Sequence, residues 1–390
     1  MKKKFTLFMA ILLSLSLLAG CAAKTDGPSG DNSDDIKVGL NYELSGNVAT
    51  YGQSLTAGIE LAMEEINANG GVLGKNIEII KVDNKSETDE AANVSTRLAT
   101  RDKVVAILGP ATSGNTKAAT PPAIQNKVPL ISASATADDV TVDSNGNVRE
   151  YIFKTCFSDS FQGVTMANFA SKDLGLTKAA ILMDNTSDYS KGLTKSFIET
   201  FTSLGGTILT EEAYQAKDTD YRAVLTSIKS TNPEVLYVPG YYEEVGLIVK
   251  QARELGLDVP VLGADGYDSP KLTEIAGEDA LKGVYYTNHY SSSDNTPEVV
   301  AFKDAFNAKY SKEADAFNAL GYDLAYFLVD AIDRAGVAEP EAIKDALAST
   351  VDFKGITGTL SIDEYHNPVK DVTILELIDG VPTFLTKLEP

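Results

Sequence analysis

In AILGPATSGNT, residues 106–116, an apolar run ends at a Gly-Pro step and gives way to small polar residues. The run Val104–Leu108 predicts a buried strand, and the residues from Gly114 onward predict a helix. A helix that begins in such a loop presents free backbone N–H groups and hydroxyls, and its N-terminus favours an anion. The stretch therefore predicts a βα unit with an anion site where the helix begins.

The same βα pattern extends to both sides of this stretch. Apolar runs of strand length alternate with amphipathic segments of helical period, which predicts a parallel sheet with right-handed crossovers. The other strands expected in this half are Ile36–Leu40, Ile77–Val82 and Val128–Ile131, and the helices are Gly52–Asn69, Asp89–Thr100 and Gly114–Ile124.

The pattern restarts after Phe153, which predicts a second α/β unit and hence a bilobal protein with a cleft between its lobes. Strands are expected at Ala179–Met183, Ile208–Tyr214, Val235–Val238 and Val261–Leu262, and helices at Ser190–Leu204, Tyr221–Ser230 and Tyr242–Leu255. The last part of the chain is expected to hold strand Val284–Asn288, helices Pro297–Tyr310 and Phe317–Ala335, and β-structure at Thr359–Ile362, Val372–Leu377 and Thr383–Leu388.

The N-terminus carries a targeting pattern. Three lysines precede an apolar run from Phe5 to Leu18 that is too short for a stable spanning helix, so we expect a signal peptide at residues 1–20. The sequence Leu-Ala-Gly before Cys21 resembles a bacterial lipobox, which predicts cleavage before Cys21 and lipidation of its sulfur. The alternative is an ordinary signal peptide with an incidental cysteine. The polar residues that follow predict a flexible tether, so 21–35 is expected to be lipidated cysteine plus tether.

Composition excludes several classes of protein. The chain has 390 residues, 43% of them hydrophobic and 23% charged, as in soluble globular proteins. Removal of residues 1–20, which carry three lysines and no acidic residue, changes the net charge from −21 to −24. Such an acidic chain without a basic cluster is not expected to bind nucleic acid. Cys156 has no partner once Cys21 is modified, so no intramolecular disulfide is expected.

Residues for catalysis, metals and cofactors are sparse. His289 and His366 stand in unrelated contexts, and the common nucleophile-elbow, phosphate-loop and dinucleotide motifs do not occur. We therefore expect no metal, no cofactor and no catalytic residues. Asp265 is the exception among the acids, because it follows a short apolar strand at the end where open α/β sheets bind ligands. An enzyme with an acid/base pair around Asp265 remains an alternative, which turnover of a bound amino-acid derivative would reveal.

Several ordered segments carry a resemblance. They are LSGNVATYG at 44–52, INANGGVLGK at 66–75, LGP at 108–110, SAT at 134–136, DYSKG at 188–192, GY at 240–241 and GADG at 263–266. Through them, the chain from Ile36 to its end resembles the substrate-binding proteins of ABC transporters for branched-chain amino acids, the leucine/isoleucine/valine-binding type with the type I periplasmic binding fold. The resemblance implies two doubly wound parallel-sheet lobes of α/β class, joined by a hinge of crossing strands.

The resemblance also implies a ligand site between the lobes. The Ser113 hydroxyl and neighbouring backbone N–H groups would hold the ligand's carboxylate, and Thr136 would contact both carboxylate and ammonium. The Ser134 position would offer its backbone carbonyl to the ammonium, and Asp265 would pair with it. Several family members have Glu where this chain has Asp265. Four aromatic residues would cap the pocket and line its side-chain end: Tyr51, Tyr189, Tyr241 and Phe317.

The domain boundaries follow from the same resemblance. The N-terminal lobe is expected at 36–154 plus 288–355 and the C-terminal lobe at 155–287 plus 356–390. The chain would cross between them near Thr155, Thr287 and Gly355.

The implied function is capture of a small amino acid and its delivery to an ABC permease in the membrane. We expect a monomer, held by its lipid at the outer face of the cytoplasmic membrane, in a Gram-positive or a Gram-negative cell. Three alternatives stay open. The protein could be a ligand-sensing subunit, it could bind another amino acid or an amide, or it could bind an aromatic acid. Leucine, isoleucine and valine differ by too little in an apolar pocket for the sequence to choose between them.

Overall fold

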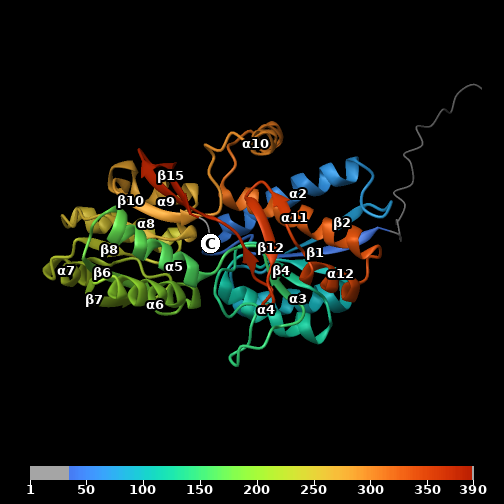
Figure 1. Cartoon of the computed structure of the whole chain (residues 1–390), viewed down its shortest axis with the longest axis horizontal. Helices are drawn as coiled ribbons and strands as arrows, with labels where there is room; N and C mark the ends of the chain where they lie inside the picture. The colour runs from blue at the N-terminus through green and yellow to red at the C-terminus, as the bar shows by residue number, and fades with distance from the viewer. Residues whose placement is uncertain (1–34, 389–390) are drawn as a thin grey trace, which may run out of the picture. The chain divides into compact units, whose positions relative to one another are not determined.

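A computed structural model describes residues 35–388, and Figure 1 shows the course of the chain. The described residues from Ile36 onward form one compact unit. The expected signal peptide, the lipidation site Cys21 and all but the last residue of the expected tether lie outside the described residues. Within the described part, no helix combines the length and the apolar character that crossing a bilayer requires.

The first sheet has five parallel strands in the order β2-β1-β3-β4-β5. Its strands are β1 (Ile36–Tyr42), β2 (Ile77–Asp83), β3 (Ala106–Leu108), β4 (Leu130–Ser132) and β5 (Ile152–Lys154). The intervening helices are α2 (Ala49–Ala68), α3 (Thr88–Arg97), the π-helical turn η1 (Leu98–Asp102) and α4 (Ser113–Gln125). The βα unit expected at 104–124 is confirmed as β3 followed by α4.

The second sheet has the order β15-β14-β10-β9-β8-β6-β7. Its parallel part contains β6 (Lys178–Asp184), β7 (Thr207–Tyr214), β8 (Val235–Tyr237), β9 (Val261–Gly263) and β10 (Val284–Asn288). The helical segments are α5 (Asp159–Asn168), η2 (Phe169–Asp173), α6 (Asp188–Ser203), α7 (Arg222–Ser230), α8 (Tyr242–Glu254), η3 (Asp265–Tyr267), α9 (Pro270–Ala276) and η4 (Glu278–Leu281).

The edge of the second sheet departs from a purely parallel arrangement. Strand β14 (Val372–Ile378) pairs antiparallel with β10, and β15 (Val381–Leu388) pairs antiparallel with β14. The two-residue turn between them is Asp379-Gly380, with φ of 50° and 74°. Two positive φ angles suit an Asp-Gly hairpin turn, so β15 folds back locally without a crossover helix.

The segment between β10 and β14 of the second sheet returns to the first lobe. It contains α10 (Pro297–Tyr310), α11 (Ala316–Ala335) and α12 (Pro340–Ala348), and then β11 (Phe353–Gly355), β12 (Gly358–Ile362) and β13 (Pro368–Val369). Helix α11 packs so closely on α2 that a Cβ at Gly58 would lie only 2.0 Å from the carbonyl oxygen of Asn318. This close approach brings Tyr51 of α2 against Phe317 of α11, with ring centroids 4.5 Å apart.

The third crossing expected at Gly355 falls inside the β11–β12 hairpin. Asp323 of α11 accepts hydrogen bonds from the backbone N–H groups of Ile356 and Thr357, each at 2.8 Å, and the ring of His366 stacks on Phe153 of β5. These contacts hold residues 356–369 against first-lobe elements. We therefore move the proposed crossing to the segment around Lys370, just before β14, and keep the other proposed boundaries.

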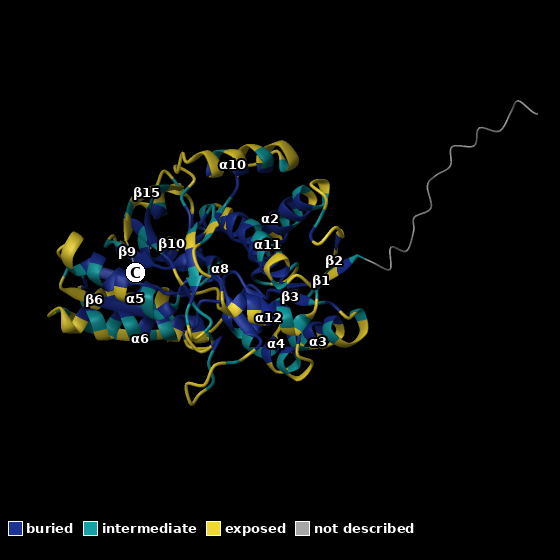
Figure 2. Ribbon diagram, turned by 45° about the vertical axis from the view of Figure 1, so that its right-hand side comes forward, coloured by how far each residue is buried: buried dark blue, intermediate teal, exposed yellow. Residues whose placement is uncertain are grey.

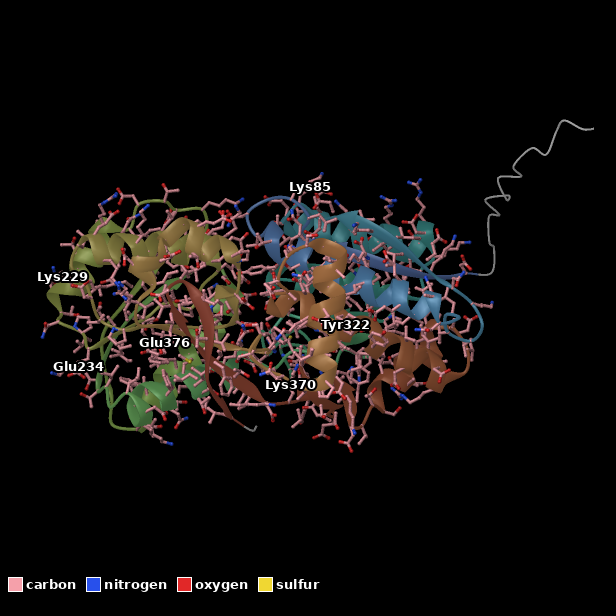
Figure 3. The ribbon with its side chains drawn as sticks, turned by 90° about the horizontal axis from the view of Figure 1, so that it is seen from above. Lys85, Lys229, Glu234, Tyr322, Lys370 and Glu376 are labelled. Carbon is pink, nitrogen blue, oxygen red and sulfur yellow. The ribbon has the colours of Figure 1, made fainter. Side chains whose placement is uncertain are left out.

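Burial and charge follow the two sheets. Figure 2 shows buried residues along the sheets and exposed residues on the outer faces of the helices. Charged side chains such as Lys85, Lys229 and Glu234 lie at the periphery of the ribbon (Figure 3). Cys156 follows β5 and is fully buried, and this burial raises the pKa of its thiol to about 12.

Candidate functional site

The loop after β3 turns sharply into α4. Gly109 has φ of 95°, and a Cβ there would meet the Asn41 carbonyl oxygen at 2.3 Å, so only glycine fits. The loop 109–112 then leads directly into Ser113, the first residue of α4. This geometry directs the backbone N–H groups of the loop toward the end of β1.

A side chain of the protein itself meets these N–H groups. The carboxylate of Glu43, the residue after β1, accepts hydrogen bonds from Ala111 N at 3.0 Å and Thr112 N at 3.2 Å. It also accepts from the Thr112 hydroxyl at 3.0 Å and from Asn115 Nδ2 at 2.8 Å. Glu43 is fully buried, so the loop already holds a protein anion. The sequence did not single out Glu43, because a lone acid after a strand resembles an ordinary loop residue.

The hydroxyls predicted to hold a carboxylate lie beside this anion. Ser113 Oγ accepts a hydrogen bond from Ala137 N at 3.1 Å, so its own hydrogen is left for another acceptor. The Thr136 hydroxyl is fully buried and has no partner among the described residues. The Ser134 hydroxyl donates to Ala111 O at 2.8 Å and is thereby engaged. The first-lobe wall of the cleft thus offers the Ser113 hydroxyl as a donor, while the Thr136 hydroxyl faces the carboxyl group of Asp159.

Asp265 lies on the opposite wall, in the first residue of η3. Its Oδ1 accepts hydrogen bonds from the Tyr189 hydroxyl at 2.8 Å and from Gln162 Nε2 at 3.0 Å. Its Oδ2 lies 3.2 Å from Nε2 of His289. Burial lowers the pKa of His289 to about 4, so the ring is neutral at pH 7 and donates its Nε2 hydrogen to Asp265.

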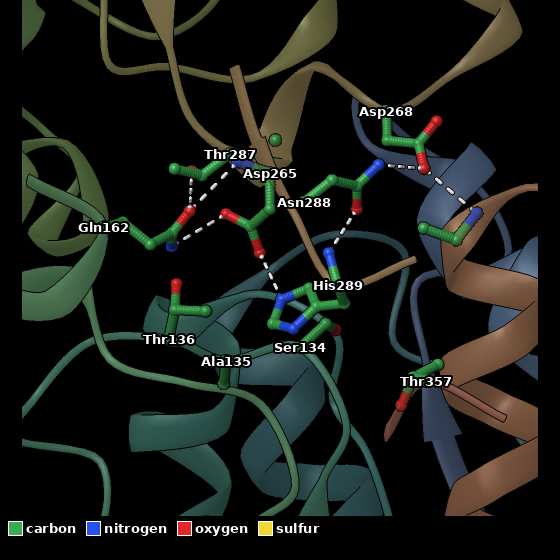
Figure 4. A network of polar contacts seen from close by, with 12 residues as sticks. Ser134, Ala135, Thr136, Gln162, Asp265, Asp268, Thr287, Asn288, His289 and Thr357 are labelled. Atoms are coloured by element: carbon green, nitrogen blue, oxygen red, sulfur yellow. Dashed lines mark hydrogen bonds and ion pairs between the residues drawn. The ribbon is translucent and has the colours of Figure 1, made fainter. Parts of the chain in front are cut away.

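The Asp265 contacts continue into a network that reaches the other lobe (Figure 4). The backbone N–H of His289 donates to Asn288 Oδ1, and Asn288 Nδ2 donates to Asp268 Oδ2 at 2.9 Å. The same Asp268 oxygen accepts from the backbone N–H of Ala316, the first residue of α11, at 3.0 Å. The network therefore connects the ligand wall of the second lobe, the end of β10 and a first-lobe helix.

Aromatic rings fill the space between the two walls. Tyr189 stacks on Tyr241 with centroids 5.0 Å apart, and Tyr51 meets Tyr241 edge to face at 5.8 Å. The Tyr51 hydroxyl donates to the carbonyl oxygen of Gly266, so this first-lobe residue is bonded to the second lobe. The predicted aromatic residues therefore do lie together.

The pocket between the walls is almost filled. Its volume is about 10 Å³, which corresponds to roughly one water molecule. An amino acid needs more space, so ligand entry requires the lobes or the aromatic side chains to move. Of the eight predicted site residues, six line this pocket, while Ser113 and Thr136 do not. The lining consists of Tyr51, Ala111, Thr112, Ser134, Tyr189, Tyr241, Asp265, Gly266 and Phe317.

Asp159, the first residue of α5, is a candidate that the sequence did not indicate. Its backbone N–H donates to Thr136 O at 2.9 Å, and neither carboxylate oxygen forms a hydrogen bond with a described residue. Burial raises the pKa of Asp159 well above its ordinary value, opposed by the neighbouring Thr136 hydroxyl. A buried carboxylate without a partner is costly, so Asp159 is a second candidate for an ammonium group. Acidic residues are common at the starts of helices, so the position of Asp159 in the sequence did not indicate a binding site.

A larger cavity of about 1100 Å³ lies on the hinge side, between α10, α11 and the strands that follow them. His289 lines it, but none of the predicted site residues does. In residues 35–388, no group of three or more His, Cys, Asp or Glu side chains is arranged to hold a metal ion.

Comparisons with known proteins agree with this architecture. The chain is 30% identical over 362 residues to the leucine-, isoleucine-, valine-, threonine- and alanine-binding protein of Pseudomonas aeruginosa, a match that covers 93% of each chain. It superimposes on the branched-chain amino acid transporter substrate-binding protein LivJ of Streptococcus pneumoniae, solved with isoleucine, with a TM-score of 0.86 and 42% identity, covering 91% of this chain and 100% of that one.

A more distant structure binds another class of ligand. It is an ABC transporter solute-binding protein from R. palustris in complex with benzoate, which matches with a TM-score of 0.82 and 26% identity over 91% of this chain and 97% of its own. The family description for periplasmic binding proteins matches residues 35–381, nearly the whole described chain. The chain therefore belongs to the periplasmic binding protein family.

Proposed function

We propose that this protein captures a branched-chain α-amino acid between its lobes and delivers it to an ABC permease. The observation that carries the proposal is the division of polarity around the pocket. Asp265 lines the pocket from the second lobe and aromatic rings fill the space between the walls, while the first-lobe wall carries the hydroxyls of Ser113 and Thr136, which are not part of the pocket lining. An α-amino acid has the matching carboxylate, ammonium and apolar side chain. The printed names of the P. aeruginosa and S. pneumoniae proteins support the same ligand class.

Each part of the ligand then has a partner. The Ser113 and Thr136 hydroxyls donate to the ligand's carboxylate at the N-terminal end of α4, where the helix dipole favours an anion. Asp265 and Asp159 accept from the ammonium. The side chain contacts the apolar end of the pocket, which is lined by Tyr51, Ala111 and Phe317.

Closure of the lobes completes the site. Several interlobe contacts favour the closed form, including Tyr51 with Gly266, Ala316 with Asp268, and Lys117 with Asp188 at 2.6 Å. A ligand shifts the equilibrium toward closure only to the extent that it binds the closed form better. The contacts of Asp265 and Tyr241, which come from the second lobe, supply that difference.

The test of this function is calorimetric titration with a panel of amino acids after bound ligand has been removed by unfolding and refolding. Leucine, isoleucine or valine is expected to bind with release of heat. A protein that binds benzoate and none of these three would contradict the proposal and favour the aromatic-acid alternative, for which the R. palustris structure is the precedent. Uptake of labelled leucine by a deletion strain tests delivery.

We further propose that the mature chain is a monomer anchored through lipid on Cys21 at the outer face of the cytoplasmic membrane. The support is the lipobox-like sequence before Cys21. Mass spectrometry of the native N-terminal peptide is expected to show a diacylglycerol on Cys21, and Cys21→Ala is expected to release binding-competent protein into the medium. An unmodified Cys21, with cleavage at an upstream residue, would overturn the anchor.

A further inference from the structure

The side-chain amide of Gln162 holds Asp265 at two points (Figure 4). Gln162 lies on α5 and is fully buried, and its Nε2 donates a hydrogen bond to Asp265 Oδ1 at 3.0 Å. Its Oε1 accepts from the backbone N–H of the same aspartate at 3.2 Å. Gln162 is not among the residues that line the pocket, so any influence on a ligand there passes through Asp265.

The partners of this amide determine its orientation. The backbone N–H of Asp265 can only donate, so the amide oxygen of Gln162 faces it and the amide nitrogen faces the carboxylate. The Thr287 hydroxyl donates to the same Oε1 at 2.5 Å. Thr287 belongs to β10, which pairs with β9, the strand that leads to Asp265. Gln162 therefore fixes the aspartate relative to both α5 and the second sheet.

The Asp265 carboxylate needs such partners because it is buried. Burial of a carboxylate is costly unless hydrogen bonds replace those it made with water. Besides Gln162, its partners are the Tyr189 hydroxyl on Oδ1 and Nε2 of His289 on Oδ2. These three contacts use three of the roughly four acceptor positions of a carboxylate, so one remains for the ammonium of a ligand.

We propose that Gln162 is a positioning residue for ammonium recognition, which acts by fixing the orientation of the Asp265 carboxylate. Of the three side chains that bond to this carboxylate, Gln162 alone also bonds to the backbone N–H of Asp265. It therefore fixes the side chain relative to its own backbone, and without it the carboxylate can turn away from the ammonium. This inference rests on the proposed function, in which Asp265 accepts from the ammonium of an α-amino acid.

Gln162→Met is the test variant, because methionine has a similar length but cannot replace either contact of the amide. Its affinity for leucine, measured by calorimetry on the full-length protein, is expected to fall by about tenfold, since a hydrogen bond to the charged carboxylate is lost. Gln251→Met is the matched control. Gln251 is a buried glutamine of α8 that accepts from Tyr221 N at 2.7 Å and donates to Thr219 O at 2.9 Å. It is expected to lower the melting temperature about as much, with leucine affinity within about twofold of the parent.

A double-mutant cycle with Asp265→Ala separates positioning from general structural damage. If Gln162 acts through the Asp265 carboxylate, Gln162→Met is expected to change leucine affinity by less than about twofold once that carboxylate is absent. A damaged fold would instead weaken binding equally in both backgrounds. An equal loss with and without the carboxylate overturns the inference, and so does parental affinity in a folded Gln162→Met.

If Gln162→Met does not fold, Thr287→Val provides a milder test, because it removes only the hydroxyl that bonds to Gln162 Oε1 and keeps the side-chain shape. Leucine affinity is expected to fall by about threefold in the parent background and to stay unchanged in Asp265→Ala. Equal affinities of the parent and Thr287→Val would overturn the inference. An Asp265→Ala variant that binds leucine as tightly as the parent, or a parent that binds no branched-chain amino acid, instead refutes the proposed function.

Discussion

The two walls of the cleft are built on different principles. The first-lobe wall is the start of α4. There, the carboxylate of Glu43 accepts hydrogen bonds from four donors of the preceding loop and the first turn of the helix. The second-lobe wall holds Asp159 and also Asp265, whose Oδ2 lies 3.2 Å from Nε2 of the neutral His289 ring. One wall is left with a hydroxyl donor to offer, and the other with carboxyl groups. In the proposed function, this difference between the walls would orient the ligand, with its carboxylate toward the first lobe and its ammonium toward the second.

The largest effect is expected from the second wall, in Asp265→Asn. The substitution keeps the shape but removes the charge opposite a buried ammonium, and breaking such a pair costs about 2–5 kcal/mol. Affinity for leucine is therefore expected to fall by about thirtyfold or more, measured by calorimetry. Asp184→Asn is the control, because Asp184 is a buried carboxylate of the same lobe that bonds to Thr186. Undiminished binding of leucine, isoleucine and valine would refute the assignment of the ammonium to this wall.

A smaller loss is expected from the first wall, in Ser113→Ala and Thr136→Ala. Each substitution removes a hydroxyl that we propose as a donor to the ligand's carboxylate, and hydrogen bonds to charged groups contribute about 1.5–3 kcal/mol. Affinity is expected to fall by about tenfold to a hundredfold in each, again by calorimetry. Thr120→Ala is the control, because its hydroxyl bonds within α4 to Thr116 O. Parental affinity in both site variants would move the carboxylate elsewhere.

Tyr51→Phe probes the contact that joins the two walls. It removes the hydroxyl that donates to Gly266 O but keeps the ring stacked on Phe317. A neutral hydrogen bond contributes about 0.5–1.5 kcal/mol, so affinity is expected to fall by about two- to tenfold. Tyr267→Phe removes a hydroxyl that bonds to Val238 O within the second lobe, and is expected to lower stability without changing affinity. Equal losses of affinity in the two variants would argue against a role of Tyr51 in closure.

A further effect, on stability and not on affinity, depends on pH and comes from Asp268 of the second lobe. Burial and the nearby Asp315 raise the pKa of Asp268 to about 7. A raised folded-state pKa means that its stabilising contribution is complete below the ordinary value near 4 and is lost as the pH rises toward 7. Asp268→Asn cannot titrate, so its melting temperature relative to the parent is expected to be a few °C higher at pH 8 than at pH 4. A difference that does not change with pH would contradict this.

The sequence allowed the fold to be predicted, and six of the eight predicted site residues line one pocket, for physical reasons that particular residues illustrate. Long apolar runs and helical periodicity indicated β1, α2 and α6 correctly, because these elements bury one clear face. Short elements such as β5 and α9 were missed, since three to seven residues show no period. The resemblance identified residues that line the pocket, but not Glu43, whose role depends on a loop 68 residues away.

The missed carboxylates share a cause. Asp159 and Glu43 are buried, whereas charged residues are usually exposed, and burial is decided by tertiary packing that no local pattern records. The hairpin at 353–362 illustrates the same point on a larger scale. Its strands were partly predicted, but the lobe it joins is decided by the contacts of its turn with Asp323, together with the stacking of His366, just beyond it, on Phe153.

The buried thiol of Cys156 gives the protein an intrinsic kinetic reporter. Once Cys21 carries lipid, Cys156 is the sole free thiol of the chain, and a pKa near 12 keeps it protonated and unreactive while the fold is intact. Alkylation can proceed only through transient opening of the segment that follows β5, so its rate measures the lifetime of that segment. Because the proposed first crossing between the lobes lies in this segment, a ligand that holds the lobes together is expected to slow the alkylation of Cys156.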